Sequence, residues 1–299
     1  MPWLQLFVDT HRDQITVIED ALLKAGAASV TLQEHVPQGQ QEKPILEPAL
    51  GETPLWDHSR VTGLFDADCD TEKVLNVVKG QVAPLPKMLW EQLEDKDWER
   101  EWMDNYHPIQ CAEKLWICPS WQSPPDPDAV NLLLDPGLAF GTGTHPTTFL
   151  CMQWLAQQNI NDLDVIDYGC GSGILGITTL LLGAKKVTGI DIDPQALLAS
   201  HENVKRNGLE IEQFPVYLPQ QKESKESSAD MVLANILAGP LVELSDILIS
   251  SLKVDGLICL SGILAKQAKQ VEQAYSHKIA FEARAEKEGW VRLSGRRYC

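Results

Sequence analysis

The chain contains 299 residues, of which 44% are hydrophobic and 22% charged, so it is long enough for two domains and has the composition of a globular protein. Its 25 basic and 42 acidic residues give a net charge of −17, which argues against direct binding to a nucleic-acid backbone. No apolar run approaches ~18 residues and no signal segment is recognisable, so we expect a cytoplasmic protein that does not enter a membrane.

Cysteine and histidine usage indicates chemistry without a metal. The seven cysteines are scattered without a C-x-x-C pair, and the seven histidines do not recur at ligand spacings. Neither a disulfide framework nor a zinc site is therefore expected.

Residues 1–90 have the pattern of a small α+β domain. Segments typical of strands and helices alternate here: strands at 3–8, 28–32 and 61–65, helices at 15–25 and 71–79, and a polar loop at 37–54. This order is typical of the ferredoxin-like fold. The region contains no catalytic motif.

Residues 91–110 are expected to link this domain to the rest of the chain. The segment from Trp90 to Asn105 is charged and carries Trp98 and Trp102 one helical turn apart. This spacing predicts a connecting helix whose tryptophans pack on a domain.

Residues 111–299 repeat a strand–helix unit four times. The pairs lie at 163–168 and 174–182, 186–190 and 194–206, 230–236 and 239–252, and 257–263 and 265–275. The repeat predicts an α/β domain with a Rossmann-like, doubly wound and mostly parallel sheet. Asp193-Pro194 is expected to cap the second of these helices and Gly208 to end it. The segment 281–297 is expected to form a β-hairpin at the sheet edge.

The most informative motif is the glycine cluster that follows the strand at 163–168. Glycines at 169, 171 and 173 admit positive φ angles and let backbone N–H groups approach a ligand closely. Asp191 follows Gly169 by 22 residues, close to the ~20-residue spacing at which a strand-end carboxylate binds both ribose hydroxyls. Cys170 is expected to be a small packed residue.

Two further segments should meet this turn at the carboxyl ends of the strands. Asn235 ends an abruptly interrupted apolar strand, and its amide is suited to orienting an amine. The hydroxyl-rich, irregular segment 134–148 is expected to form a wall or lid for the ligand. His145 has no acidic neighbour in sequence, so it is a poor candidate for a base.

The residues alone leave other functions open. Residues 171–176 also match the G-x-G-x-x-G pattern, so a nicotinamide-dependent oxidoreductase is the alternative enzyme. A non-enzymatic adaptor would keep an acidic N-terminal region but would have no need for Asp191.

The motifs resemble those of class I S-adenosylmethionine-dependent methyltransferases. More specifically, the segments DPGLAFGTGTHPTT, DYGCGSGILG, GIDIDPQAL and ANILAGPL, in this order, are similar to those of the ribosomal protein L-eleven methyltransferase (PrmA) family. The likeness extends from PWLQL at the start to SGR at the end. The segments 37–44 and 219–229 depart from the family pattern and are expected to be surface variation.

This resemblance implies an N-terminal domain that holds a ribosomal protein and a C-terminal domain that holds S-adenosylmethionine. It implies cofactor contacts at Thr148, Gly169, Asp191 and Asn235, and we add Gly171 from the glycine turn. The implied reaction is methylation of lysine ε-amines and of the N-terminal α-amine of a basic large-subunit ribosomal protein. We assign no catalytic base and expect a monomer.

The distribution of charge agrees with this implied division of labour. Residues 1–95 hold 16 acidic and 7 basic side chains, a net charge of −9. An acidic docking domain attracts a basic protein, whereas carboxylates at the reaction centre would hold the target amine in its protonated, unreactive form.

Overall fold

The computed structural model describes residues 3–36, 55–93, 106–135, 143–221 and 229–299. The expected loop at 37–54 and most of the segment 219–229 therefore lie outside the described residues. The chain divides into two compact units, residues 1–103 and residues 104–299, and each is described by itself.

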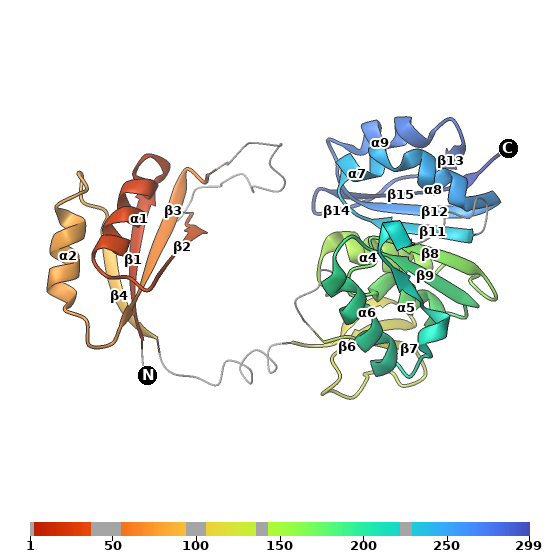
Figure 1. Ribbon diagram of the computed structural model, residues 1–299, viewed down its shortest axis with the longest axis horizontal. Helices are drawn as coiled ribbons and strands as arrows, with labels where there is room; N and C mark the ends of the chain where they lie inside the picture. The colour runs from red at the N-terminus through yellow and green to blue at the C-terminus, as the bar shows by residue number, and fades with distance from the viewer. Residues whose placement is uncertain (1–2, 37–54, 94–105, 136–142, 222–228) are drawn as a thin grey trace. The chain divides into compact units, whose positions relative to one another are not determined.

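The first unit is a four-stranded antiparallel sheet with helices on one face (Figure 1). Its elements are β1 (Trp3–His11), α1 (Ile15–Lys24), β2 (Ser29–Glu34), β3 (His58–Asp66), α2 (Thr71–Lys79) and β4 (Lys87–Leu93). The strand order is β2-β3-β1-β4. Apolar side chains of β1 and β3, such as Leu6 and Val61, pack on those of the helices, such as Ile18 and Val78. The ferredoxin-like prediction is confirmed.

Strand β4 corrects one sequence-based expectation. A helix was predicted from Trp90 onward, but residues 87–93 pair with β1 as an edge strand, with Trp90 opposite Leu6. Trp90 packs edge-on against Phe65 at a ring distance of 5.4 Å. The rest of the predicted helix, with Trp98 and Trp102, falls in 94–105, outside the described residues.

The second unit is built on an eight-stranded sheet. The strand order is β10-β9-β8-β11-β12-β15-β13, with β14 paired to β15. Its strands are β8 (Asp164–Tyr168), β9 (Lys186–Ile190), β10 (Val216–Tyr217), β11 (Ala229–Asn235), β12 (Leu252–Leu264), β13 (Ile279–Phe281), β14 (Ala285–Lys287) and β15 (Trp290–Arg297). The first five in this order are parallel and β15 is antiparallel to its neighbours. The doubly wound, mostly parallel prediction is confirmed. The hairpin predicted at 281–297 is present as β14 and β15, but β15 is an inner strand between β12 and β13 and does not form the edge.

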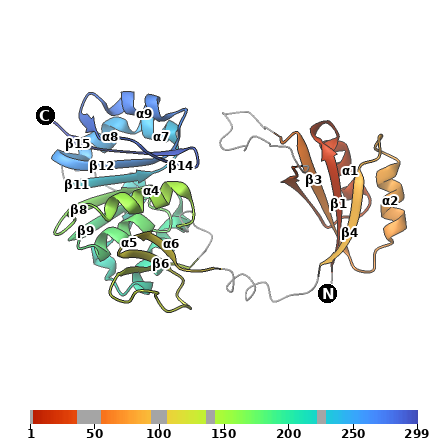
Figure 2. The same ribbon diagram turned by 180° about the vertical axis from the view of Figure 1, so that it is seen from behind.

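Helices cover both faces of this sheet (Figures 1 and 2). They are α4 (Pro146–Leu155), α5 (Ile174–Leu181), α6 (Pro194–Arg206), α7 (Ala238–Glu243), α8 (Ser245–Ser251) and α9 (Ala268–Tyr275). One core lies under α4, α5 and α6 and a second under α7, α8 and α9. The sequence predicted a single helix at 239–252, whereas the structure has two shorter helices there, α7 and α8.

Helix α6 begins and ends as the sequence predicts. The Asp193 carboxylate accepts a hydrogen bond from the backbone N–H of Gln195 at 2.9 Å, and Pro194 occupies the first turn. Gly208 follows the helix at φ +67°, where a side chain is unfavourable.

A small three-stranded sheet was not predicted from the sequence. It consists of β5 (Ile109–Ala112), β6 (Leu115–Cys118) and β7 (Val130–Leu133). Asn207, at the end of α6, holds β7 through two reciprocal bonds of 2.8 Å with the backbone of Leu133.

None of the helices in the described part of the chain combines the length and the apolar character needed to cross a membrane.

Candidate active site

The strand order reverses between β8 and β11, which lie side by side in the sheet. In open parallel sheets, ligands bind at the carboxyl ends of the strands beside such a reversal. Here Tyr168 pairs with Ala234, so the glycine cluster and Asn235 leave neighbouring strands at the same level. Tyr168 also pairs with Ile190, which brings Asp191 to this edge.

The glycine cluster forms the tight turn that its composition predicts. Gly169, Gly171 and Gly173 have φ angles of +74°, +54° and +80°. The N–H of Gly169 donates to the carbonyl of Ile190 at 2.7 Å, which ties the turn to β9. Positive φ at three alternate positions turns the backbone without side chains between it and a ligand.

Helix α6 holds the outer side of this turn. The Ser200 hydroxyl donates to the carbonyl of Gly171 at 2.9 Å, and the Asn203 amide donates to the carbonyl of Ser172 at 2.8 Å. Sequence reasoning missed both residues. The feature of the sequence that could have identified them is a pair of polar residues three positions apart on the apolar side of an amphipathic helix.

The Asp191 carboxylate accepts two backbone hydrogen bonds. Oδ2 accepts from the N–H of Gly171 at 2.8 Å, and Oδ1 accepts from the N–H of Asp193 at 3.0 Å. A carboxylate has about four acceptor positions, so two remain for a ligand. Asp191 therefore both fixes the glycine turn and presents negative charge beside it.

Asn235 and Thr148 come together although 87 residues separate them in the sequence. The Asn235 Nδ2 donates to the Thr148 hydroxyl at 3.2 Å. The Asn235 Oδ1 is buried and finds no donor among the residues that the structure describes. Since an unpaired buried acceptor is costly, this oxygen is a place where a ligand donor gains binding energy.

Ile236 is enclosed between Gly169, in the turn after β8, and Gly262, in β12. A Cβ atom at Gly169 would lie 2.2 Å from the Ile236 Cγ2, and a Cβ atom at Gly262 would lie 2.2 Å from the Ile236 carbonyl oxygen. Gly262 also has a φ angle of +85°. We call this contact the glycine clamp, and it fixes the backbone that carries Asn235.

Asp167, the acidic residue of the glycine motif, is fully buried behind the turn. Its Oδ2 accepts from the N–H of Gly176 at 2.9 Å, in the first turn of α5. Burial, with a smaller contribution from the charge of Asp191, raises the pKa of Asp167 from 3.8 to about 7. Its carboxyl group therefore binds a proton well above the pH at which an exposed aspartate loses it.

The Asp167→Asn variant is expected to gain stability over the wild type as pH rises from about 4 to 7. The wild-type carboxyl, whose pKa is raised on folding, is stabilising when protonated, and that contribution is lost as pH rises through this window. The upper limit of the gain is about 4 kcal/mol at 1.36 kcal/mol per pKa unit. Urea unfolding of both proteins across this range measures it. An unchanged difference in unfolding free energy across the range contradicts the raised pKa.

His145 serves as the N-cap of α4. Its Nδ1 lies 3.3 Å from the N–H of Thr147 and 2.8 Å from the Thr147 hydroxyl, and its ring stands edge-on to Trp290 at 4.9 Å. Burial lowers the pKa of His145, so its imidazole favours the neutral form. This capping role explains a histidine at this position without base catalysis.

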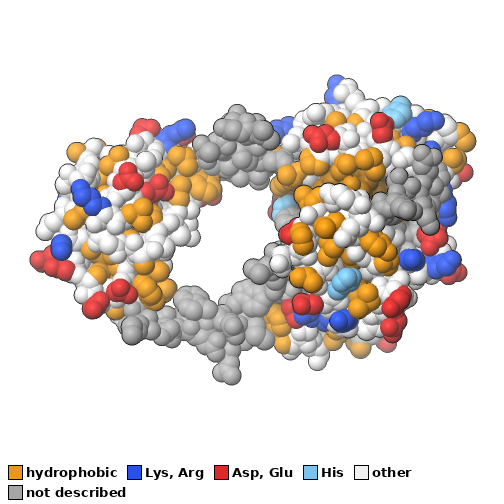
Figure 3. Space-filling view, in the orientation of Figure 1, with side chains coloured by type: hydrophobic (Ala, Val, Ile, Leu, Met, Phe, Trp, Pro, Cys, Tyr) orange, Lys and Arg blue, Asp and Glu red, His pale blue; other side chains and the backbone are white. Residues whose placement is uncertain are grey.

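Two exposed apolar residues flank the site. Ile192 and Leu237 are 81% and 52% exposed, and each follows a strand-end polar group, Asp191 and Asn235 respectively, by one or two positions. Figure 3 shows hydrophobic side chains gathered in a band across the visible face of this unit. The sequence analysis did not identify these two residues.

The structure brings the sequence-predicted residues Thr148, Gly169, Gly171, Asp191 and Asn235 to one edge of the sheet. Residues 136–142 of the predicted wall or lid lie outside the described residues. Within the described residues, no group of three or more His, Cys, Asp and Glu side chains is arranged to hold a metal ion.

Comparison with known proteins gives relatives that match almost the whole chain. A ribosomal protein L11 methyltransferase of Cellvibrio japonicus is 61% identical over 295 residues, which cover 98% of each protein. A protein of the same name from Pseudomonas aeruginosa is 51% identical, with 99% of each covered. The crystal structure of a ribosomal protein L11 methylase from Lactobacillus delbrueckii superposes with a TM-score of 0.58 at 34% identity, over 65% of this chain and 100% of that one.

These similarities do not support the nicotinamide-dependent oxidoreductase that the G-x-G-x-x-G pattern left open. The model of the ribosomal protein L11 methyltransferase (PrmA) family matches residues 2–298 and so includes both units. With relatives of this identity over the full length, the chain belongs to that family.

Proposed function

We propose that the protein transfers methyl groups from S-adenosylmethionine to lysine ε-amines and to the N-terminal α-amine of ribosomal protein L11. The observation that carries this proposal is the unpaired Oδ1 of Asn235 beside the glycine turn. An oriented acceptor at this position can receive an N–H of the target amine and direct its lone pair.

The site residues fit S-adenosylmethionine, which supplies an electrophilic methyl group on a sulfonium. We assign Thr148, Gly169, Gly171, Asp191 and Asn235 to its binding. The Asp191 carboxylate offers acceptors for the ribose hydroxyls, and the glycine turn admits the ligand against the backbone. The exposed side chains of Ile192 and Leu237 offer apolar surface that a flat base can cover.

Methyl transfer to a lysine requires a neutral amine. Removing the proton from a lysine of pKa ~10.4 at pH 7 costs about 4 to 5 kcal/mol. A desolvated position near a sulfonium cation reduces this cost, whereas a nearby carboxylate increases it. Asn235 provides an acceptor without negative charge. The three residues after it, Ile236, Leu237 and Ala238, carry no charged side chain either.

Asn235 is assigned both to cofactor binding and to amine orientation, and its replacement tests the two roles together. Asn235→Ala is expected to lower kcat roughly 10- to 100-fold, because one hydrogen bond to the reacting amine is lost. Asn235→Asp keeps an acceptor but adds a charge that favours the ammonium form, so its rate should rise only at higher pH. Steady-state rates across pH, with S-adenosylhomocysteine affinity measured in parallel, check both expectations. A wild-type kcat for Asn235→Ala contradicts the orienting role.

We propose that residues 1–90 form the domain that docks the protein substrate, that 91–110 link it, and that 111–299 form the catalytic domain. Support comes from the two compact units and from the net charge of −9 on residues 1–95. An acidic surface speeds the approach of a basic protein and loses this effect at high salt. We propose that the enzyme does not bind nucleic acid directly. We also propose that it acts as a monomer.

A chain beginning at residue 104 is expected to bind S-adenosylhomocysteine with nearly normal affinity. The predicted cofactor residues and both hydrophobic cores of the catalytic unit remain. Methylation of ribosomal protein L11 should fall roughly 100-fold or more, because the proposed docking domain is absent. Calorimetry and methylation rates of the two chains measure these effects. Full rates from the truncated chain rule out the docking role.

The decisive test of the proposed function is incubation of the protein with S-adenosylmethionine and unmodified ribosomal protein L11. Mass spectrometry of the digested substrate should show methyl groups on lysine side chains and on the N-terminal amine. The Asp191→Ala protein serves as the negative control. A substrate without added mass contradicts the proposal.

A further inference from the structure

Three polar side chains follow one another on α6 at intervals of three residues: Ser200, Asn203 and Arg206. Residues at this spacing are neighbours on the surface of a helix. The first two are buried, and they donate to the carbonyls of Gly171 and Ser172 in the glycine turn. Arg206 is the last residue of the helix and extends the row away from the turn.

Arg206 lies between two groups and binds both of them. Its Nε is 3.1 Å from the Oδ2 of Asp135, which follows β7 by two residues. Its Nη1 donates to the Oδ1 of Asn203. Because the guanidinium is planar and rigid, it holds Asp135 and Asn203 at a fixed separation. The side chains of Arg206 and Asp135 are both partly buried, so solvent screens this ion pair less than a fully exposed one.

Asp135 is held from a third direction. Its Oδ1 accepts from the N–H of Ser120 at 2.7 Å, and its Oδ2 accepts from the Ser120 hydroxyl at 2.8 Å. Ser120 follows β6 by two residues, and β6 pairs with β7 in the small three-stranded sheet. The carboxylate of Asp135 therefore joins the ends of two neighbouring strands to α6.

The contact with Arg206 also determines which way the Asn203 amide faces. The oxygen of this amide accepts from Arg206, and its nitrogen donates to the carbonyl of Ser172 at 2.8 Å. In the opposite orientation, the amide nitrogen would face the guanidinium and the amide oxygen would face the Ser172 carbonyl. Both contacts would then be repulsive. Arg206 therefore keeps the donor of Asn203 directed at the glycine turn.

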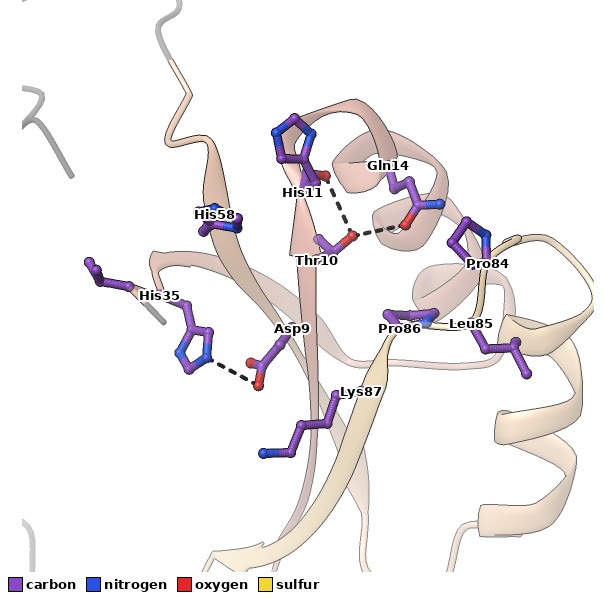
Figure 4. A pocket seen from close by; sticks show the side chains of 11 residues that line it. Asp9, Thr10, His11, Gln14, His35, His58, Pro84, Leu85, Pro86 and Lys87 are labelled. Atoms are coloured by element: carbon purple, nitrogen blue, oxygen red, sulfur yellow. Dashed lines mark hydrogen bonds and ion pairs between the residues drawn. The ribbon is translucent and has the colours of Figure 1, made fainter. Parts of the chain in front are cut away.

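The polar contacts around the cavity of the N-terminal unit have a different reach. There the Thr10 hydroxyl donates to the Oε1 of Gln14 at 3.2 Å, and the Nε2 of His35 lies 3.3 Å from the Oδ2 of Asp9 (Figure 4). These contacts join neighbouring segments of that unit. The contacts of Arg206, by contrast, lead to a turn that is assigned to the cofactor.

We propose that Arg206 is a positioning residue for the cofactor. Through Asn203 it fixes the carbonyl of Ser172, and through Asp135 it ties the glycine turn to the small sheet. The small sheet then shares with α6 the task of setting the shape of the turn. This inference rests on the proposed assignment of the glycine turn to S-adenosylmethionine.

Replacement of Arg206 in the full-length protein tests the positioning role. Arg206→Met should weaken binding of S-adenosylhomocysteine roughly tenfold, because Asn203 loses the donor that orients it. The KM for S-adenosylmethionine should rise by a similar factor while kcat changes little, since Asn235 and Thr148 lie on other segments. Calorimetry, steady-state kinetics and urea unfolding measure affinity, turnover and stability. A less stable Arg206→Met protein with wild-type affinity overturns the proposal.

Asn207→Ala is the matched control at the same end of α6. It removes the two bonds to the backbone of Leu133 but leaves the side-chain contacts of Arg206 in place. This variant should lose stability and keep its affinity for S-adenosylhomocysteine. Equal weakening of binding by Asn207→Ala and Arg206→Met would show that any loosening of α6 disturbs the turn, and it would contradict a specific role for Arg206.

Arg206→Lys separates the charge from the geometry. An ammonium keeps the attraction to Asp135 but lacks the planar fork that holds Asp135 and Asn203 together. The lysine variant should therefore be more stable than Arg206→Met and still bind S-adenosylhomocysteine more weakly than the wild type. Wild-type affinity in Arg206→Lys would show that the charge alone suffices, against the two-sided contact.

Amide hydrogen exchange in the cofactor-free protein gives a readout that needs no ligand. The N–H of Gly171 donates to Asp191 and the N–H of Gly173 donates to the carbonyl of Cys170, each at 2.8 Å, so their exchange reports opening of the turn. Both amides should exchange roughly tenfold faster in Arg206→Met than in the wild type or in Asn207→Ala.

Two outcomes of the exchange experiment separate this inference from the cofactor assignment. Unchanged exchange at Gly171 and Gly173 in Arg206→Met overturns the link between Arg206 and the turn. Faster exchange, in a protein whose wild type does not bind S-adenosylhomocysteine, supports that link and contradicts the cofactor assignment instead.

Discussion

The Asp191→Ala variant is expected to lose affinity for S-adenosylhomocysteine by at least about 100-fold while it remains folded. Each hydrogen bond from a ribose hydroxyl to the carboxylate contributes roughly 1.5 to 3 kcal/mol. Loss of the bond to the N–H of Gly171 also releases the glycine turn. Isothermal titration calorimetry gives the affinity and circular dichroism confirms the fold.

The Asp191→Asn variant is the matched control for this effect. It preserves the size of the side chain and one acceptor oxygen but removes the charge, so its loss should be intermediate. If a folded Asp191→Ala protein binds as tightly as the wild type, the carboxylate is purely structural. The cofactor assignment would then be wrong at this residue.

The Gly262→Ala variant should be destabilised by about 2 to 5 kcal/mol and should lose methyl transfer. The added Cβ would lie 2.2 Å from the Ile236 carbonyl oxygen and 2.7 Å from its carbonyl carbon. Since these are backbone atoms, the chain that carries Asn235 must move. Urea unfolding gives the stability, and methylation rates normalised to folded protein give the catalytic effect.

Gly208→Ala provides the control for backbone strain alone. Gly208 also has a positive φ, +67°, but a Cβ atom there would have no neighbour within 4 Å. This variant should cost about 1 to 2 kcal/mol and keep its activity. Similar losses in the two variants would show that strain at positive φ, and not the contact with Ile236, explains the effect.

The elements that the sequence predicted correctly are those with strong local signals. The βαβ unit around Gly169 and Asp191 combines a buried apolar strand, a glycine turn and an apolar helix, and all three appear close to the expected positions. Helix α2 agrees residue for residue with the predicted range 71–79 because Asp70 caps it and Gly80 follows it.

The elements that were missed depend on contacts between distant residues. Strand β4 carries alternating exposed and half-buried residues with charges nearby, and only its pairing with β1 makes it a strand. Strand β7 has four residues and is held by Asn207, 74 positions further along. Likewise, Asn235 was identified as a site residue, but its partner was not: its Nδ2 donates to the hydroxyl of Thr148, 87 residues away.

With the role that we propose for Asn235, the glycine clamp determines what the enzyme can recognise at the reacting atom. Because Ile236 is held between Gly169 and Gly262, the Asn235 oxygen occupies one fixed point, and the incoming group has to reach it. A lysine side chain and a free chain terminus both carry a nitrogen on a flexible tether. A fixed acceptor of this kind selects a nitrogen by whether it can reach that point, and it does not distinguish which residue carries the nitrogen. Choice among the amines of a substrate must then come from how the substrate is held elsewhere.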